Sequence, residues 1–315
     1  MDYKNIVNPK YRCSNELFNS IIDDLSLSLS FKDIAKKNFV SSGVVTRYLS
    51  IFSYFMQWNN ITTLPKHIGV DEFKGNCDKS KYLFHIYDLD TNETVHILRT
   101  REYTEIFNFF SKIDNKYDVE IVSMDLYTPF KNAVKDKLKR AVIIADRFHY
   151  TRIISEALDE LRLKVWRNAK NEEKKYFKSL KRALLKDIEN VKPEKLLSLQ
   201  EKLNYAFSFS PELKYGYELY QSFLRIKDGI NYDEKCKRFK DWLDDAQSST
   251  IPEFNSATET LLKWHKEILN SFKYTYTNSA TEGKNNKIKV IKRNAFGFRN
   301  LNNFINRIKI RDIKV

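Results

Sequence analysis

The spacing of apolar residues divides the chain into segments of different secondary structure. In the first sixty residues, apolar side chains recur every three or four positions and predict helices over 16–25, 30–37 and 42–49. The turn at 38–41 and a serine cap at Ser41 or Ser42 favour a helix-turn-helix over residues 1–62. Its third helix would present Thr46 and Arg47 to a major groove. A plain three-helix packing unit remains the alternative.

Residues 63–150 alternate short apolar runs with helical periods. The order is three strands, a helix, a strand, a helix and a strand. The strands are expected to end at Asp71, Tyr87, Leu98, Met124 and Ala145. A helix that crosses between two strands implies parallel pairing, so the fold class is α/β with a mixed sheet and helices on its faces.

Strand signals then cease for more than a hundred residues. Residues 151–274 carry Leu, Phe and Tyr at spacings of three and four among long charged stretches, which predicts an all-helical insertion. The last segment, residues 275–315, is predicted to add a final helix to the domain that contains the sheet. It is also strongly basic. From Gly283 to Val315 it holds ten Lys plus Arg and one acid, Asp312.

Composition narrows the class of partner. The 315 residues include 55 Lys plus Arg and 41 Asp plus Glu, a formal charge of +14, which favours a polyanion such as nucleic acid. The three cysteines form no Cys-x-x-Cys pair, which argues against a disulfide framework and a Cys-ligated zinc. Without a signal peptide or an apolar membrane span, we expect a cytoplasmic protein with no membrane partner.

Three acids are candidates for metal chemistry. Asp71 and Asp125 follow predicted strands and would lie at one edge of the sheet if those strands are neighbours, and Glu282 opens the basic segment. Mg²⁺ prefers hard oxygen ligands, and two such ions can clamp the attacking and leaving oxygens of a phosphoryl displacement. Each acid also has a structural alternative, because Asp71 and Asp125 could cap turns and Ser279 to Glu282 fits a capping box.

Four blocks of sequence resemble the DDE transposases of bacterial insertion sequences, in the ISL-three group. They are Gly69–Phe73, Ser123–Phe130, Ala145–His149 and Thr277–Gly297, so the resemblance runs from about His67 to Ile308. The Asp-Arg-Phe-His block and the Glu-Gly-x-Asn-Asn-x-Ile-Lys block are its most specific parts. The resemblance implies an RNase H-like core, interrupted by the helical insertion before the helix that bears the last acid.

Carried over by position, the resemblance makes Asp71, Asp125 and Glu282 the catalytic acids and ligands of two Mg²⁺ or Mn²⁺ ions. Asp146 is the alternative second acid, because it too follows a strand. His149 either assists at the scissile phosphate or fixes the site by hydrogen bonding.

The implied activity is metal-dependent cleavage of DNA at transposon ends and strand transfer into target DNA. The basic residues of the last segment would hold the DNA backbone. With Arg147, the predicted backbone contacts are Lys284, Lys287, Lys289, Lys292 and Arg293. The resemblance further implies a homodimer or larger assembly on DNA, in the nucleoid of a bacterial cell.

One departure from the group is the lack of a Cys-rich zinc-binding segment before the first helices. The alternative is therefore a truncated or catalytically inactive remnant that binds DNA, and a host nuclease of RNase H-like fold is a third possibility.

Overall fold

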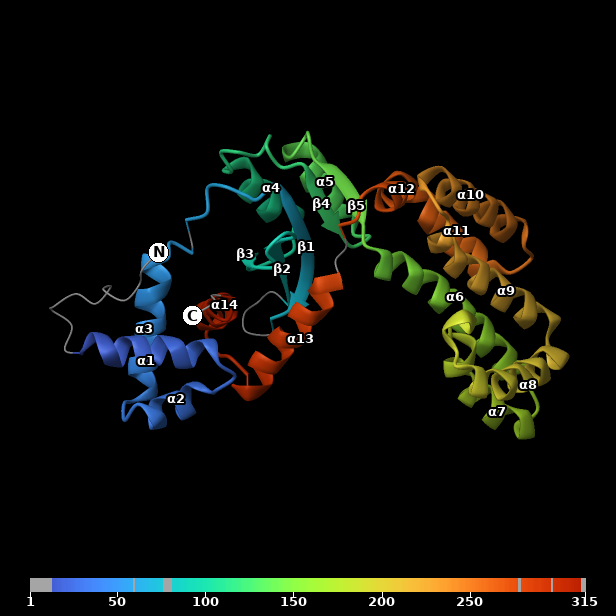
Figure 1. The fold of residues 1–315 in the computed structure, drawn as a ribbon, viewed down its shortest axis with the longest axis horizontal. Coiled ribbons are helices and arrows are strands. Elements are labelled where there is room, and N and C mark those ends of the chain that lie inside the picture. The colour runs from blue at the N-terminus through green and yellow to red at the C-terminus, as the bar shows by residue number, and fades with distance from the viewer. Residues whose placement is uncertain (1–12, 59, 76–80, 277–278, 296, 313–315) are drawn as a thin grey trace. The chain divides into compact units, whose positions relative to one another are not determined.

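The computed structural model describes residues 13–58, 60–75, 81–276, 279–295 and 297–312 (Figure 1). The chain divides into two compact units. The core unit comprises residues 1–143 and 276–315, and the helical unit comprises residues 144–275. The boundary between the units falls within the last strand of the sheet.

Three helices open the described chain, as the apolar spacing predicts: α1 (Asn15–Ser26), α2 (Phe31–Lys37) and α3 (Ser42–Phe55). Each begins at a serine whose side chain accepts a hydrogen bond from the first turn, and Ser41 is the cap of α3. Their shared core is apolar and also contains Ile310 from the last helix of the chain. The N-terminal helices therefore pack against the C-terminal end of the same unit.

The five predicted strands form one mixed sheet: β1 (His67–Lys74), β2 (Tyr82–Asp88), β3 (Thr94–Leu98), β4 (Ile121–Met124) and β5 (Val142–Ala145). Their order is β3-β2-β1-β4-β5. β2 is antiparallel to both β1 and β3, and β1 is parallel to β4. The sheet thus has the expected mixture of hairpin and crossover connections.

One strand boundary was predicted wrongly. Asp71 does not end β1 but lies within it, because residues 72–74 continue the antiparallel pairing with β2. The parallel pairing with β4, in contrast, ends at Val70. Asp71 therefore directly follows the residues that pair β1 with β4, and it lies in the middle of the residues that pair β1 with β2.

Helices cover both faces of the sheet, as Figure 1 shows. On one face, α4 (Tyr103–Ser111) and α5 (Thr128–Lys137) meet the ring of Phe84 through Phe110 and Phe130. On the other face, α13 (Ser279–Asn294) and α14 (Leu301–Ile310) join a second apolar cluster. This cluster contains Phe73, Leu83, Ile97, Ile288, Ile291, Leu301, Phe304, Ile305 and Ile308.

After Ala145, the described residues of the helical unit contain no strand. Its helices are α6 (Arg147–Asn168), α7 (Asn171–Leu184), α8 (Pro193–Phe209), α9 (Pro211–Arg225), α10 (Tyr232–Ser248), α11 (Pro252–Lys263) and α12 (His265–Lys273). Some buried polar groups in this unit have hydrogen-bond partners within it. For example, the indole of Trp242 donates to the carbonyl of Leu219 at 2.7 Å.

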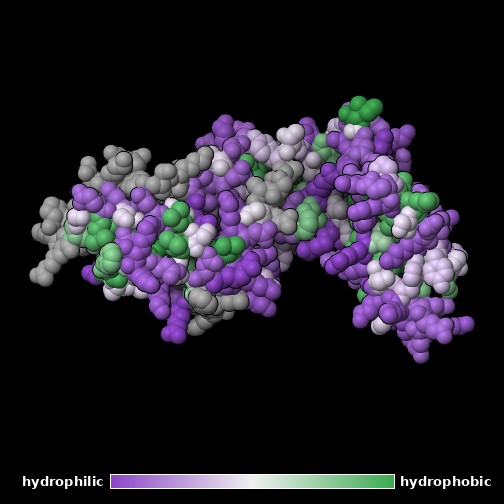
Figure 2. Space-filling view, turned by 60° about the horizontal axis from the view of Figure 1, so that its bottom comes forward, coloured by the Kyte–Doolittle hydropathy of each residue, from purple (hydrophilic) through white to green (hydrophobic). Residues whose placement is uncertain are grey.

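The visible surface of each unit in Figure 2 is mainly hydrophilic, and hydrophobic residues form small separate groups. No helix among the described residues is long and apolar enough to cross a membrane. Cys13 and Cys236 are free, half-buried thiols, whereas Cys77 lies outside the described residues.

Candidate active site

Two carboxylates meet at the centre of the sheet because of strand register. The last residue pair between the parallel strands β1 and β4 is Val70 with Met124. Asp71 and Asp125 are the next residues of their chains, and paired positions of neighbouring strands project to the same face. The sheet therefore places the first two predicted acids side by side within the core unit.

Asp71 is buried, with 5% of its surface exposed. Burial raises the pKa of its carboxyl group to about 7, and the negative charge of Asp125 and a hydrogen bond with Asp125 act in the same direction. Hydrogen bonds from Asn285 and from the backbone N–H of Glu72 lower this pKa, without offsetting the burial. Because Asp71 is buried next to a second carboxyl group, its negative charge is compensated either by a bound proton or by a nearby cation.

Asn285 of α13 completes this arrangement. Its side-chain N–H donates to Oδ2 of Asp71 at 2.6 Å, and its amide oxygen Oδ1 is buried without a hydrogen-bond partner among the described residues. Sequence reasoning missed Asn285 as a site residue, although it lies in one of the most specific blocks of the resemblance. A usable signal was its spacing, since it follows Glu282 by three residues, about one helical turn.

The side chain of Glu282 lies outside the described part of the structure. Its backbone belongs to α13, one turn before Asn285. Positions i and i+3 share a helix face, and the Asn285 side chain on that face contacts Asp71. The role of Glu282 as the third acid stays a prediction.

Asp146 and His149 belong to the helical unit. Asp146 directly follows β5, which lies next to β4 in the sheet, and its side chain caps α6 by accepting from the N–H of Phe148 at 3.2 Å. His149 lies one turn further along α6, with Nε2 3.7 Å from Oδ2 of Asp146. Asp146 is thus a buried helix cap that also interacts with a half-buried imidazole.

The predicted DNA contacts on α13 fall into two groups. Lys287, Lys289 and Arg293 are exposed, whereas Lys292 is half-buried and donates from Nζ to the carbonyl of Lys74 at 2.8 Å. Lys284 is 7% exposed, and its ammonium group pairs with Asp312 at 3.1 Å. Its side chain therefore points into the core unit, which does not support its prediction as a backbone contact.

The other predicted contacts lie at helix surfaces. Arg47 is exposed on α3, while Thr46 is half-buried and donates from Oγ1 to the carbonyl of Gly43 at 3.1 Å. Arg147 is exposed in the first turn of α6.

Beside Lys284 lies His85, the residue of β2 that pairs with Asp71 in the antiparallel register. His85 is fully buried, and its Nε2 lies 3.0 Å from Oγ1 of Thr94. Burial lowers the pKa of its imidazole to about 3, and the positive charge of Lys284 contributes to this shift. The imidazole is therefore neutral at physiological pH.

Comparison with known proteins places this geometry in a family. Residues 68–308 match the sequence model of a family described as Transposase, the DDE transposases of the ISL-three group. The transposase for insertion sequence element IS1557 of Mycobacterium tuberculosis is 25% identical over 260 residues, covering 74% of this chain and 57% of that protein. The transposase for insertion sequence element IS1001 of Bordetella parapertussis is 25% identical over 200 residues, covering 61% and 47%.

A further similarity is shorter. A protein of Lactococcus lactis subsp. lactis named ATP-dependent protease is 37% identical over 106 residues, which cover 32% of this chain and 31% of that protein. The chain thus spans between about a third and somewhat more than half of these relatives. The family match, in contrast, extends over most of the chain and includes Asp71, Asp125, Glu282 and Asn285. This chain therefore belongs to the ISL-three group of DDE transposases.

Proposed function

We propose that the chain is the transposase of an insertion sequence, which cleaves DNA at the ends of the element and joins them to target DNA. The observation that carries this proposal is the interaction between the buried Asp71 and the half-buried Asp125, with Asn285 hydrogen-bonded to Asp71. Two adjacent carboxylates, one of them buried, are costly for folding, so their presence at the centre of the sheet favours a role in binding a cation.

The donor set fits Mg²⁺ or Mn²⁺, because it consists of carboxylate and amide oxygens. Asp71 and Asp125 would hold the metal, with Glu282 as the third ligand and two ions in all. When bound, such ions supply Lewis acidity to the phosphodiester and lower the pKa of an attacking water. Asn285 keeps the Asp71 carboxylate in one orientation, so that the ligand atoms are arranged before DNA binds.

Strand register supports Asp125 as the second acid rather than Asp146. Asp125 occupies the position after the pair Val70 and Met124, next to Asp71, and its charge acts on the Asp71 carboxyl group. Asp146 caps α6 and contacts His149. We propose that this second pair fixes the first turn of α6, where Arg147 is exposed for a contact with DNA.

The order of elements supports an RNase H-like core within the sheet domain. The first acid lies on β1, the second follows β4, and the third lies in a helix after the all-helical insertion. We assign residues 63–150 and 275–315 to this core, 151–274 to the insertion and 1–62 to a helix-turn-helix domain. The capped helices α2 and α3, joined by a four-residue turn, support the last assignment.

DNA is the proposed partner at the exposed surface of α13. Lys287, Lys289 and Arg293 recur there at spacings of two and four residues and are exposed. Such residues bind phosphates without reading base sequence. We further propose a homodimer or larger assembly on DNA, working in the cytoplasm at the nucleoid.

The test is a cleavage assay on duplex DNA that carries the ends of the element, with Mg²⁺ or Mn²⁺ added. We expect metal-dependent nicking by the full chain and its loss in Asp71→Asn and Asp125→Asn, with DNA binding retained. Asp118→Asn is the matched control, because Asp118 is an exposed acid of the same unit. If the wild-type protein bound DNA but did not cleave it under any metal condition, only the alternative of a catalytically inactive, DNA-binding remnant would stand.

A further inference from the structure

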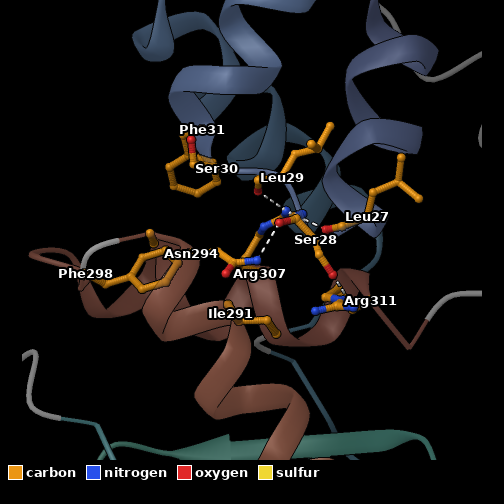
Figure 3. A pocket seen from close by; sticks show the side chains of 11 residues that line it. Leu27, Ser28, Leu29, Ser30, Phe31, Ile291, Asn294, Phe298, Arg307 and Arg311 are labelled. Atoms are coloured by element: carbon orange, nitrogen blue, oxygen red, sulfur yellow. Dashed lines mark hydrogen bonds between the residues drawn. The ribbon is translucent and has the colours of Figure 1, made fainter.

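Two arginines of the last helix end in a small cavity of the core unit (Figure 3). Arg307 and Arg311 are one helical turn apart, at the C-terminal part of α14. Opposite them lies the connection between α1 and α2, residues 27–30, and the end of α13 closes the cavity. The free space is about the size of one water molecule or a halide ion.

Part of the hydrogen bonding of these arginines goes to the end of α1. Arg307 donates from Nη2 to the carbonyls of Leu27 and Leu29 at 2.8 and 2.7 Å, and Leu27 is the C-cap of α1. Arg311 donates from its Nη2 to the hydroxyl of Ser28 at 3.0 Å. A cation at a helix C-terminus interacts favourably with the helix dipole, so these contacts have a structural explanation.

The other terminal nitrogens have no such explanation. Nη1 of Arg307 and Nη1 of Arg311 are both buried, and neither has a hydrogen-bond partner among the described residues. Arg307 is 3% exposed in total. Unpartnered nitrogens on two guanidinium groups in one cavity are unusual, because buried donors in folded proteins are almost always satisfied.

The charge is also uncompensated. Of the described acidic side chains, none forms an ion pair with either arginine. The acid next in sequence, Asp312, instead pairs with Lys284 and accepts a hydrogen bond from the N–H of Thr94 at 2.7 Å. Burial and the nearby charge of Arg311 lower the pKa of Arg307 to about 9. A water molecule could accept hydrogen bonds from both arginines. Because water is neutral, however, it would leave the two positive charges without compensation.

We propose that this cavity is a binding site for a small monovalent anion such as chloride, held between Nη1 of Arg307 and Nη1 of Arg311. A phosphate oxygen of a DNA strand has the same chemistry, and the experiments below distinguish the two sources. In either case the anion stabilises the contact between the N-terminal helices and the helix pair α13 and α14. This site is separate from the acid pair and does not depend on the proposed function.

The first test is thermal unfolding of the full chain at constant ionic strength, with chloride or bromide replacing gluconate. We expect the melting temperature of the wild type to rise saturably by about 2–4 °C. Arg311→Gln should abolish the rise, and Arg311→Lys, which keeps the charge without the planar fork, should weaken it. The control Arg182→Gln removes an exposed arginine of the helical unit and should leave the rise unchanged.

The second test needs no variant, so it holds even if Arg311→Gln fails to fold. Crystals of the wild-type protein grown or soaked with bromide should show an anomalous peak between the two guanidinium groups.

If halide has no effect but Arg311→Gln reduces the salt dependence of duplex binding by about one phosphate contact, the anion is a DNA phosphate. No halide effect, no bromide peak and an unchanged salt dependence would together overturn the proposal.

Discussion

At the scale of single residues, the proposed metal site depends on three side chains from three separate segments. Asp71 comes from β1, Asp125 follows β4 and Asn285 lies on α13. Asn285 donates its side-chain hydrogen bond to Asp71 from α13, which packs on one face of the sheet. Asn285 therefore orients the acid from the opposite layer of the fold.

Replacing Asn285 tests this orienting role. Asn285→Ala removes the 2.6 Å hydrogen bond to Asp71, and the loss of such a supporting contact typically lowers metal affinity or activity about 10–100-fold. We expect the metal concentration for half-maximal DNA cleavage to rise in this variant. Asn286→Ala is the control, because Asn286 is the exposed neighbour on the same helix. Equal metal dependence in both variants would exclude the role.

The neutral state of buried His85 predicts a pH dependence of stability. Its pKa in the folded protein is about 3, below its ordinary value of 6.5, so between these values the unfolded chain binds more protons. Its contribution to stability is complete above pH 6.5 and is lost as the pH falls towards 3. From pH 6.5 to 5 the loss is about 2 kcal/mol, at roughly 1.4 kcal/mol per pH unit.

Urea unfolding of wild type and His85→Gln at pH 7 and pH 5 measures this loss. Glutamine can still donate to Thr94, so the variant keeps the polar contact without the titrating ring. The wild type should lose more free energy of unfolding than the variant on acidification. The same loss in both proteins would show that His85 is not the group responsible.

At the scale of secondary-structure elements, most of the fold could be predicted from sequence. Periods of two and of three to four residues distinguish strands from helices, and helices between the later strands predict parallel pairing, which β1 and β4 show. The end of β1 could not be predicted in this way. An apolar run that ends at Val70 cannot reveal that Glu72 to Lys74 continue an antiparallel ladder, because pairing depends on β2.

Helix α13 shows the same limit for the site. Its sequence is basic from Lys284 onward, and the charge pattern alone does not indicate which lysines face water. Tertiary packing turns Lys284 towards Asp312 and His85, and turns Asn285 towards Asp71. Sequence therefore predicted Lys284 as a DNA contact and passed over Asn285.

A pair of lysine variants on α13 separates these environments. Lys284→Gln leaves the half-buried Asp312 without its ammonium partner, so we expect a loss of about 1–3 kcal/mol in the free energy of unfolding. Lys287→Gln should leave stability unchanged but weaken duplex binding and reduce its salt slope by about one. Melting curves and DNA titrations at several salt concentrations measure both effects. If only Lys284→Gln altered the salt dependence of duplex binding, Lys284 rather than Lys287 would be the DNA contact.

At the scale of the whole molecule, the C-terminal helix α14 connects the parts of the core unit. It packs on the sheet through Phe304, and its polar residues reach the N-terminal helices. Asn306 accepts from Ser53 at 2.9 Å, and Lys309 donates to the carbonyl of Trp58 at 2.9 Å. The N-terminal helices are thus fixed to the same unit that carries the acid pair, although they are distant in sequence from α14.

This long-range docking could not be predicted from the sequence. Nothing in the pattern of residues 301–310 indicates a contact with residues 13–58, since helical periodicity fixes a face but not its partner. The helical character of the long segment after β5, in contrast, could be recognised from the absence of strand signals. The sequence pattern therefore predicted the secondary-structure elements, but it could not predict the contacts between elements that are distant in sequence.

The most direct test of the account is Mn²⁺ binding to the full chain, measured by calorimetry at pH 8. We predict that the wild type binds Mn²⁺ and that Asp71→Asn and Asp125→Asn each weaken binding at least about tenfold, since both carboxylates are ligands. Asp118→Asn should bind like the wild type. Equal Mn²⁺ affinity in all four proteins would contradict the claim that Asp71 and Asp125 form a metal site.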